Sequence, residues 1–468
     1  MIKFKSDWSK IKWNLPAWFY DAKFGIYCHF GVYCVPAFDN EWYSHNMYVA
    51  GHKANLYHTE KYGHPSKFGY KDFIPMFKAE KFDADEWAKI FIRAGAKFAG
   101  IVAEHADGFA MWNSDLTRWC AAKMGPKRDI VGEVQESFQR RGLKFLVTFH
   151  HQWNWGWYPT DDKTVDASNP AFSGLYGFCT PRSAFGMNPN PKPNRDFQIL
   201  WMNKIREVID NYFPDAIYFD SRLQVIDEDF RFKIIEYYYN KSRKSGRETL
   251  VTYKDEDLPH HVGVLTIERS RMTILKNHVW LQDDSIDWKS WCYVQNPHFK
   301  DAGRLVDQLV DVISKNGILL LNVTPKADGE IPKEVKRVLF EIGDWLMING
   351  EAIYGSRPWR VFGEGPTCLS DEIVREEVIS NFLPGDIRFT RKEDNLYAIL
   401  LEWPGEKIII KSLAKDMAKE RVHEVVLLGF DKEIAWQQDQ NGLTVYLPPE
   451  RPCKYAYTLR MKIDKTVE

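Results

Sequence analysis

The chain has 468 residues, of which 44% are hydrophobic, and its formal net charge at pH 7 is −1. This length is too great for one hydrophobic core, so we expect two or three domains. The near-neutral charge, without long basic or acidic blocks, gives no electrostatic reason to expect binding to nucleic acid or to an anionic membrane surface. No run of about 18 apolar residues occurs, and we predict no membrane-spanning helix.

The start of the chain and its cysteines bear on location and redox chemistry. The first 20 residues lack the apolar segment of a secretory signal. We expect a secreted or periplasmic protein whose signal peptide is absent from this chain, with a cytoplasmic protein as the alternative. The seven cysteines are scattered, with no CxxC pair, which argues against zinc ribbons and thioredoxin-type chemistry. No oligomeric state follows from the sequence.

Eight apolar runs of strand length follow one another along the first three quarters of the chain. They span residues 24–31, 98–108, 144–151, 216–221, 249–256, 262–269, 279–285 and 318–325. Their apolarity is continuous rather than alternating, which is typical of parallel strands covered on both faces.

Helical patterns separate several of these runs. Asp83 and Glu86 predict a capping box, and the apolar stripe after them ends at Gly95. Residues 194–213, 228–243, 302–316 and 332–347 have the same character. The gaps after residues 256 and 269 are too short for full crossover helices. We therefore predict a (β/α)8-type, TIM-like barrel with an irregular second half, over residues 1–356.

The pattern changes to hairpins in the remaining residues, 357–468. Leu443, Val445 and Leu447 alternate with polar residues, and alternate apolar residues in 455–463 share one face. This pattern predicts a C-terminal antiparallel β-sandwich domain.

Polar and titratable side chains gather where the eight predicted strands end. Enzymes with this barrel place their reactive residues at the C-terminal ends of the strands. The residues found there are His29, Glu104, His105, Asp107, His150, His151, Asp220, Lys254, Asp255, Glu256, Glu268, Arg269, Asp283 and Asp284. Their concentration favours a functional site at this end of the barrel.

Each of these residues also has a structural interpretation. Asp220 could cap a turn or pair with Arg222, and Glu268 could pair with Arg269 or Arg271. The tandem histidines at 150 and 151 point to opposite faces of a strand, so at most one of them can line a site. A hydrogen-bonded core position is the alternative for His29, and core packing is the alternative for Trp42, Trp153, Trp155 and Trp291.

Two carboxylates from different strands at one end of a barrel fit glycoside hydrolysis. That reaction needs a carboxylate and a carboxylic acid on either side of the scissile bond. Histidines for hydroxyl groups and aromatic rings for apolar sugar faces are also available. Motifs for metal, nucleotide and serine-hydrolase sites (HExxH, DxDxDG, GxxxxGK, GxGxxG, GxSxG) are absent. We therefore predict no metal and no cofactor.

Several long motifs in order resemble the α-L-fucosidases, glycoside hydrolase family 29. They are "WFYDAKFGIYCHFGVYCVPAFDNEWYSHNMY" (18–48), "EHADGFAMWNSD" (104–115), "GPKRDIVGE" (125–133), "PDAIYFDS" (214–221), "SKNGILLLNVTPKADGEIP" (314–332) and "NGEAIYGSRPW" (349–359). The resemblance spans the barrel and, more loosely, the C-terminal sheets.

The resemblance implies catalytic roles for two residues. The strand-4 aspartate of the family attacks the anomeric carbon, and the matching residue is Asp220. The acid/base is a glutamate whose position varies within the family. Glu268 lies at a suitable strand end and is our prediction, with Glu256 and Asp283 as alternatives.

Sugar-binding roles carry over in the same way. They fall on His29, Glu41, Trp42, His105 and Trp291, with Trp291 bordering the fucose methyl group. The sequence departs from the family at Ala106, where a second histidine is usual, and at Lys254, where some members have arginine. We hypothesise that His150 or His151 fills the space left by Ala106, so both are candidate substrate-binding residues, together with Lys254.

The function implied is that of a retaining, exo-acting α-L-fucosidase. It would release terminal α-L-fucosyl residues from a fucosylated oligosaccharide or polysaccharide through a covalent fucosyl-enzyme. A related α-L-glycosidase, such as an α-L-galactosidase, is the first alternative, since apolar pockets discriminate poorly against an added hydroxyl. A carbohydrate-binding protein with impaired catalysis is the second.

Overall fold

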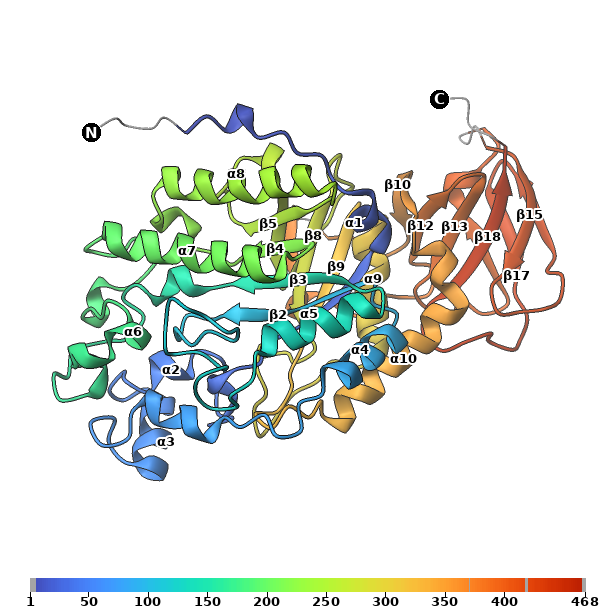
Figure 1. The fold of residues 1–468 in the computed structure, drawn as a ribbon. Helices are drawn as coiled ribbons and strands as arrows, with labels where there is room; N and C mark the ends of the chain where they lie inside the picture. The colour runs from blue at the N-terminus through green and yellow to red at the C-terminus, as the bar shows by residue number, and fades with distance from the viewer. Residues whose placement is uncertain (1–5, 370, 417–419, 465–468) are drawn as a thin grey trace.

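Eight parallel strands close into a barrel in the computed structural model, which describes residues 6–369, 371–416 and 420–464 (Figure 1). The order around the barrel is β1 (Phe24–Cys28), β2 (Phe98–Glu104), β3 (Lys144–Phe149), β4 (Ala216–Phe219), β5 (Leu250–Lys254), β6 (Val264–Glu268), β8 (Trp280–Ser285) and β9 (Gly317–Val323). Each strand falls within one of the eight apolar runs, except that β9 begins one residue early, at Gly317, and β9 pairs with β1 to close the sheet. The predicted barrel is confirmed.

Six long helices surround most of the barrel. They are α4 (Ala84–Arg93), α5 (Ile130–Arg140), α7 (Arg195–Tyr212), α8 (Glu228–Ser245), α9 (Ala302–Ser314) and α10 (Lys333–Asn349). Asp83 caps α4 by accepting hydrogen bonds from the N–H groups of Asp85 (2.8 Å) and Glu86 (3.0 Å). The side chain of Glu86 instead binds Lys336 Nζ at 2.6 Å, so the reciprocal half of the predicted capping box is wrong.

The remaining α-helices of the described residues lie before the first strand or in the loops after β1 and β3. α1 (Ala17–Ala22) precedes the barrel, α2 (Tyr43–Asn46) and α3 (Lys53–Tyr62) follow β1, and α6 (Ser173–Tyr176) follows β3. Figure 1 shows α2, α3 and α6 gathered beyond the C-terminal ends of the strands. These loops build the walls around that end of the barrel.

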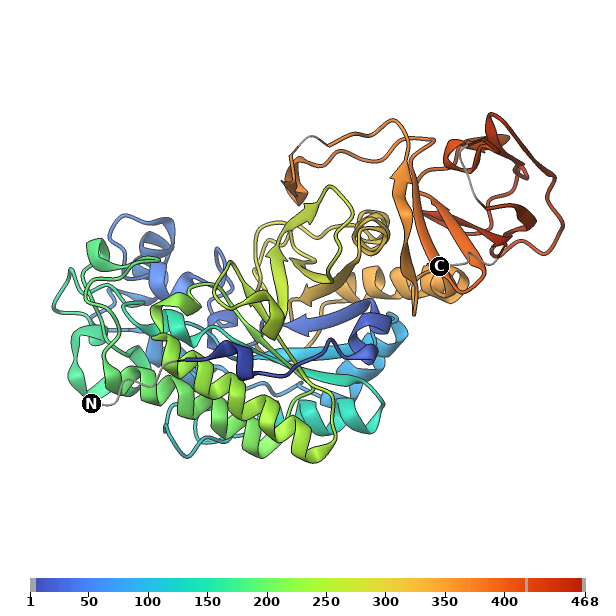
Figure 2. The same cartoon turned by 90° about the horizontal axis from the view of Figure 1, so that it is seen from above.

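The second half of the barrel is irregular, as predicted. The connection from β5 to β6 contains the short 3-10 turn His260–Val262, and the connection from β6 to β8 contains the strand β7 (Ser270–Met272). β11 (Ile373–Arg375), from beyond the barrel, pairs antiparallel with β7. Figure 2 shows this orange segment reaching back over the yellow-green part of the barrel. The sequence did not predict this covering.

Two antiparallel sheets form the C-terminal region. The larger has the order β10 (Arg357–Glu364), β12 (Ile387–Lys392), β13 (Asn395–Leu400), β18 (Tyr457–Ile463) and β15 (Val422–Leu427). The smaller has the order β14 (Lys407–Ile410), β17 (Gly442–Tyr446) and β16 (Trp436–Asp439). Phe389 and Leu459 of the first sheet share a core with Val445 of the second, which confirms the β-sandwich.

The predicted alternation in residues 455–463 holds from Tyr457 onward, where every second side chain enters the sandwich core. Tyr455 lies before β18 and hydrogen-bonds Glu341 of α10 instead. Among the described residues, no helix combines the length and the hydrophobicity needed to cross a membrane.

Candidate active site

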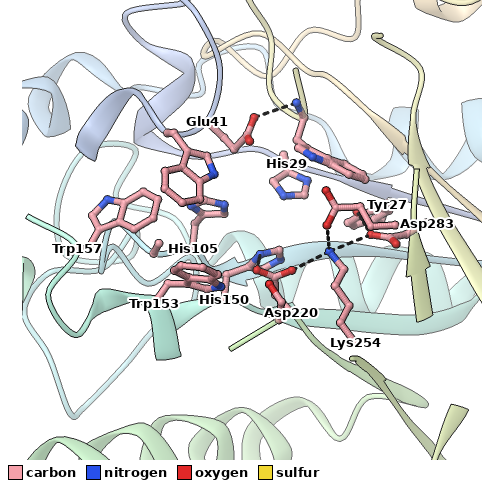
Figure 3. A pocket seen from close by; sticks show the side chains of 15 residues that line it. Tyr27, His29, Glu41, His105, His150, Trp153, Trp157, Asp220, Lys254 and Asp283 are labelled. Carbon is pink, nitrogen blue, oxygen red and sulfur yellow. Dashed lines mark hydrogen bonds and ion pairs between the residues drawn. The ribbon is translucent and has the colours of Figure 1, made fainter. Parts of the chain in front are cut away.

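A cavity with about 540 Å³ of empty space opens at the C-terminal ends of the barrel strands (Figure 3). Its lining residues are Tyr27, His29, Glu41, Trp42, His105, Ala106, His150, Trp153, Trp157, Asp220, Ser221, Lys254, Glu268, Asp283 and Trp291. Every residue predicted to be catalytic or sugar-binding lies here except His151.

Asp220 follows β4, and its carboxylate faces the cavity. Oδ1 lies 2.8 Å from Lys254 Nζ, and Oδ2 lies 3.3 Å from His150 Nδ1. Burial raises the pKa of this carboxyl, but Lys254 and His150 outweigh it and hold the pKa well below its ordinary value. Asp220 is therefore ionised and lines the cavity.

The arginine pairings considered as structural alternatives for the two carboxylates are wrong. Arg222 points away from Asp220 and donates to the carbonyl oxygens of Gly186 (2.8 Å) and Trp155 (3.0 Å). The side chain of Arg269 donates to the backbone carbonyls of Asp287 and Trp288. The side chain of Arg271 donates to the carboxylates of Glu376 and Asp311. Glu268 is thus left to pair with Lys254.

Lys254 joins three carboxylates with one ammonium group. Its Nζ contacts Asp220 and Glu268 directly and lies 3.6 Å from Asp283 Oδ2. Asp220 Oδ1 and Glu268 Oε2 both contact Lys254 Nζ. The distance between these two oxygens is therefore less than the sum of two hydrogen-bond lengths. Carboxyl groups about 5–5.5 Å apart are typical of retaining glycosidases, and wider spacings of about 6.5–9.5 Å are typical of inverting ones.

Asp283 and Glu256, the alternatives for the acid/base, occupy different positions. Asp283 lines the cavity but is almost fully buried, and its Oδ2 accepts from Tyr218 Oη at 2.9 Å and from Tyr27 Oη at 3.4 Å. Burial raises its pKa to about 6, although Lys254 acts in the opposite direction. Glu256 is exposed and is not among the residues that line the cavity.

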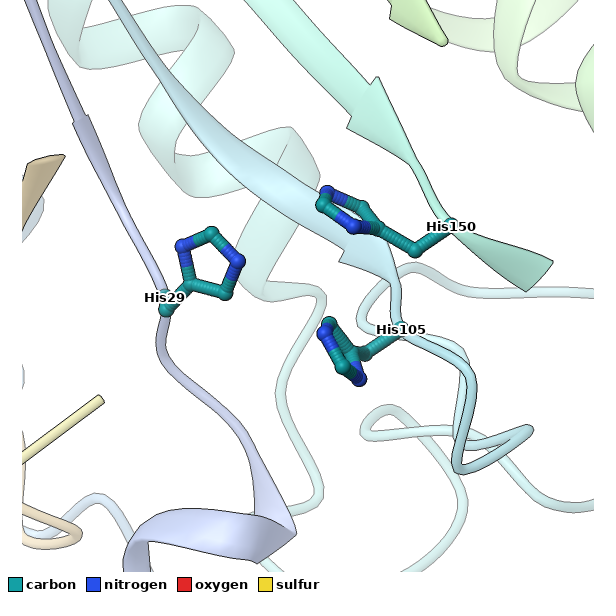
Figure 4. Close-up of side chains that lie close together, drawn as sticks. All are labelled: His29, His105 and His150. Atoms are coloured by element: carbon teal, nitrogen blue, oxygen red, sulfur yellow. The ribbon is translucent and has the colours of Figure 1, made fainter. Parts of the chain in front are cut away.

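Three buried histidines converge on one side of the cavity (Figure 4). His29, His105 and His150 each offer a ring nitrogen, and these atoms lie within 4.8 Å of one another. Burial lowers the pKa of His29 and His105 well below its ordinary value. Neutral imidazoles suit the hydroxyl groups of a sugar, and such a set of nitrogens is also one that a zinc-like ion can bind.

The hydrogen bonds around His29 fix its tautomer. Asn322 donates through Nδ2 to Ser285 Oγ (3.0 Å) and to the carbonyl of Trp291 (2.6 Å). Its Oδ1 therefore faces His29 and accepts from Nδ1–H at 2.9 Å. The lone pair of His29 Nε2 remains as a hydrogen-bond acceptor.

Aromatic rings form the other walls of the cavity. Trp42 packs against Trp157 with ring centroids 4.6 Å apart and against Trp153 at 5.6 Å. Trp291 packs against His29 at 5.4 Å, and its backbone N–H donates to Glu41 Oε2 at 3.0 Å. Burial raises the pKa of Glu41 to about 7. This arrangement can enclose one small ring and offer donors and acceptors to its hydroxyl groups.

His150 and His151 point in opposite directions, as predicted, although neither lies on a strand, because β3 ends at Phe149 and a 3-10 turn begins at His151. His150 lies beside His105, with ring centroids 4.9 Å apart, in the part of the cavity that Ala106 also lines. His151 donates through Nε2 to the carbonyl of Trp201 at 3.2 Å and packs against that indole ring. The expectation that His151 contacts a ligand therefore needs correction, because its side chain faces away from the cavity.

Sequence reasoning missed or misplaced several lining residues. Trp157 was overlooked, and Trp153 was given only a core-packing interpretation. Both follow β3 in "HHQWNWGWY" (150–158), and the density of tryptophans after a strand end was an available signal. Tyr27 belongs to β1 itself, and its hydroxyl group reaches the floor from a position that looks like core.

Comparisons with known proteins identify relatives along nearly the whole chain. The family model "Alpha-L-fucosidase" matches residues 2–351, and the model "Alpha-L-fucosidase C-terminal domain" matches residues 380–462. The plasma alpha-L-fucosidase of Homo sapiens is 30% identical, and the alignment covers 98% of this chain and 92% of that protein. The tissue alpha-L-fucosidase of Bos taurus is 29% identical, with 98% and 91% covered. A Thermotoga maritima alpha-fucosidase solved in complex with fucose is 28% identical, with 98% and 100% of the chains covered and a TM-score of 0.75.

Proposed function

This chain belongs to the α-L-fucosidase family of glycoside hydrolases, and we propose that Asp220 is its nucleophile and Glu268 its acid/base. The activity is retaining α-L-fucosidase activity, with two successive displacements at the anomeric carbon. The observation that carries the assignment is the single ammonium group of Lys254, which contacts both carboxylates at the cavity surface.

In the first displacement, the ionised carboxylate of Asp220 attacks the anomeric carbon of the bound fucosyl group. The bond to the leaving oxygen breaks, and that oxygen takes the proton of Glu268. In the second displacement, Glu268 removes a proton from water, whose oxygen attacks the same carbon and releases Asp220. Two inversions at one carbon give net retention.

The remaining lining residues would hold the sugar. His29, His105, His150 and Glu41 supply buried donors and acceptors for hydroxyl groups, and the indole rings supply apolar walls. A cavity closed by these walls accepts a terminal residue, which supports exo action on a fucosylated oligosaccharide or polysaccharide. Neither alternative is favoured: both carboxylates needed for catalysis are present, and the family match concerns fucosidases rather than galactosidases.

We also propose a domain division between residues 356 and 357, which assigns β10 and all later strands to the C-terminal domain. In support, β10 begins at Arg357 as the first strand of the larger C-terminal sheet. The segment containing β11 then belongs to the C-terminal domain although it pairs with the barrel.

Azide separates the two proposed roles by the stereochemistry of its product. Asp220→Gly should lose roughly 1,000-fold or more of the hydrolysis of an aryl α-L-fucoside. Azide should take the place of the missing nucleophile and give the inverted β-fucosyl azide. In Glu268→Ala, azide should attack the fucosyl-enzyme and give the retained α-fucosyl azide. Retained product from Asp220→Gly, or inverted product from Glu268→Ala, would contradict the assignment.

A further inference from the structure

In the described part of the chain, the connection after β6, the strand of the proposed acid/base, contains β7 rather than a helix, and a segment of the C-terminal domain pairs with β7. β11 pairs with β7, with Val374 opposite Arg271 and Arg375 opposite Ser270. We propose that Glu376, the residue after β11, is a positioning residue for Glu268. The proposal rests on the role of Glu268 proposed above.

Backbone contacts connect Glu376 to the residue next to Glu268. The N–H of Glu376 donates to the carbonyl oxygen of Arg269 at 2.9 Å, and the N–H of Arg269 donates to the carbonyl oxygen of Asp283 at 2.9 Å. Arg269 has a φ of 45°, in the left-handed region that non-glycine residues rarely adopt. The turn that ends β6 is therefore held from both sides, by β8 and by Glu376.

The side chain of Glu376 reinforces this hold. It is 2% exposed and binds the guanidinium of Arg271 with both oxygens, at 2.6 Å for Oε2. Gln282 Nε2 donates to Oε1 at 2.8 Å, and Arg304 Nη2 donates to the backbone oxygen of Glu376 at 2.6 Å. Burial raises the pKa of Glu376, but Arg271 and Gln282 outweigh it and lower the pKa, so the carboxylate is ionised.

The direction of Glu268 depends on this backbone because little else fixes the side chain. The side chain of Glu268 is 41% exposed and accepts a hydrogen bond from Lys254. Proton delivery needs a heavy-atom distance within hydrogen-bond reach of the leaving oxygen. A misplacement of about 1 Å can cost roughly 100-fold in rate. Asp220 stands on β4 and does not contact Glu376, so nucleophilic attack should be unaffected.

The test measures how kcat/KM depends on the leaving group. In Glu376→Gln, the amide keeps the shape of the side chain but loses the charge that binds Arg271. We expect kcat/KM to fall roughly 10- to 100-fold for methyl α-L-fucoside, which needs protonation of its leaving oxygen. For 2,4-dinitrophenyl α-L-fucoside, which leaves without a proton, the change should be within about 3-fold.

A buried glutamate of the C-terminal β-sandwich domain provides a matched control. Glu420 is also buried and accepts a hydrogen bond from the indole of Trp359 at 3.1 Å, within the C-terminal domain. Glu420→Gln should shift the melting temperature without changing the leaving-group dependence.

If Glu376→Gln does not fold, a double variant takes its place. Arg271→Met combined with Glu376→Met removes the two buried charges together, a change that is often tolerated. This variant should show the same selective loss.

The outcomes separate this inference from the catalytic assignment. Glu268→Ala should itself lose far more activity on the methyl than on the dinitrophenyl substrate; without that difference, the assignment of Glu268 fails. If Glu268→Ala shows the difference and the folded Glu376 variant loses activity equally on both substrates, or on neither, the positioning role is overturned.

Discussion

The two halves of the barrel hold the two proposed catalytic carboxylates in different ways. Asp220 ends a strand that lies between long helices; its side chain is 15% exposed, and Lys254 and His150 contact it. Glu268 ends a strand between two short connections, and its side chain is 41% exposed. The proposed nucleophile is fixed by the barrel itself, whereas the proposed acid/base, which would meet both a leaving group and water, lies where a distant segment completes the wall.

The largest expected effect comes from Lys254, where the two halves meet. In Lys254→Met, burial is no longer opposed by the ammonium group, and the pKa of Asp220 should rise. Because the nucleophile must be ionised, activity should then disappear at a higher pH as the solution is acidified. We expect kcat/KM on an aryl α-L-fucoside to fall roughly 100-fold or more at neutral pH. A pH profile from pH 4 to 8 should show the acidic limb displaced upward.

Lys254→Arg is the matched control for this experiment. It keeps the positive charge beside Asp220, so its acidic limb should coincide with that of the unaltered protein even if its rate is lower. If Lys254→Met has the same acidic limb as the unaltered protein, Lys254 does not set the ionisation of the nucleophile, and the comparison between the two halves loses its electrostatic basis.

The second prediction concerns a buried charge without such a partner. Lys23 precedes β1 at the opposite end of the barrel; it is fully buried, and its Nζ has no hydrogen-bond partner among the described residues. The ring of Tyr20 lies 4.2 Å from this nitrogen. Burial lowers the pKa of Lys23 to about 7 from 10.5. The unfolded chain therefore holds a proton that the folded chain releases between these two values.

This shift fixes how stability depends on pH. The cost of burying Lys23 is complete below about pH 7 and is relieved as the pH rises toward 10.5. Lys23→Met should raise the free energy of unfolding by about 2–4 kcal/mol at pH 6, and by less at pH 9. Activity should be unchanged. Denaturant unfolding at the two pH values measures the difference; an equal gain at both would mean that ionisation of Lys23 is not the cause.

The barrel was predictable from the sequence because its signals are local. Each strand is a continuous apolar run, and each of the early strands ends in a side chain that the cavity uses, such as His29, His105 and Asp220. The carboxyl ends of parallel strands meet at one end of a barrel, so residues distant in sequence could be assigned to one site without knowing any distance. Only one of His150 and His151 lines the cavity, as predicted, but the strand geometry behind that prediction does not apply, because both residues follow the end of β3.

The parts that could not be predicted depend on contacts between distant segments. Nothing in "REEVIS" (375–380) indicates that Glu376 binds Arg271, because the pairing of β11 with β7 depends on the path of the chain through the C-terminal domain. The same holds for Lys254, whose contacts with Asp220 and Glu268 depend on three neighbouring strands. Side-chain direction after a strand ends is equally non-local, which is why Trp153 and Trp157 were not recognised as lining residues.

The smallest expected effect concerns Glu41, which connects the two halves from the cavity wall. It follows β1, yet its carboxylate accepts the backbone N–H of Trp291 from the loop after β8. Burial raises its pKa to about 7 from 4.5, so its negative charge opposes folding increasingly as the pH rises from about 4.5 to about 7. Glu41→Gln should therefore be more stable than the unaltered protein by about 1–3 kcal/mol at pH 8 and indistinguishable from it near pH 4.

Glu41→Gln should also bind the sugar less well, since the carboxylate is proposed to accept hydrogen bonds from hydroxyl groups. Glu424→Gln, on the exposed face of β15, is the control and should show no pH-dependent gain. A stability gain with undiminished affinity for fucose would mean that Glu41 holds the halves together without serving the substrate.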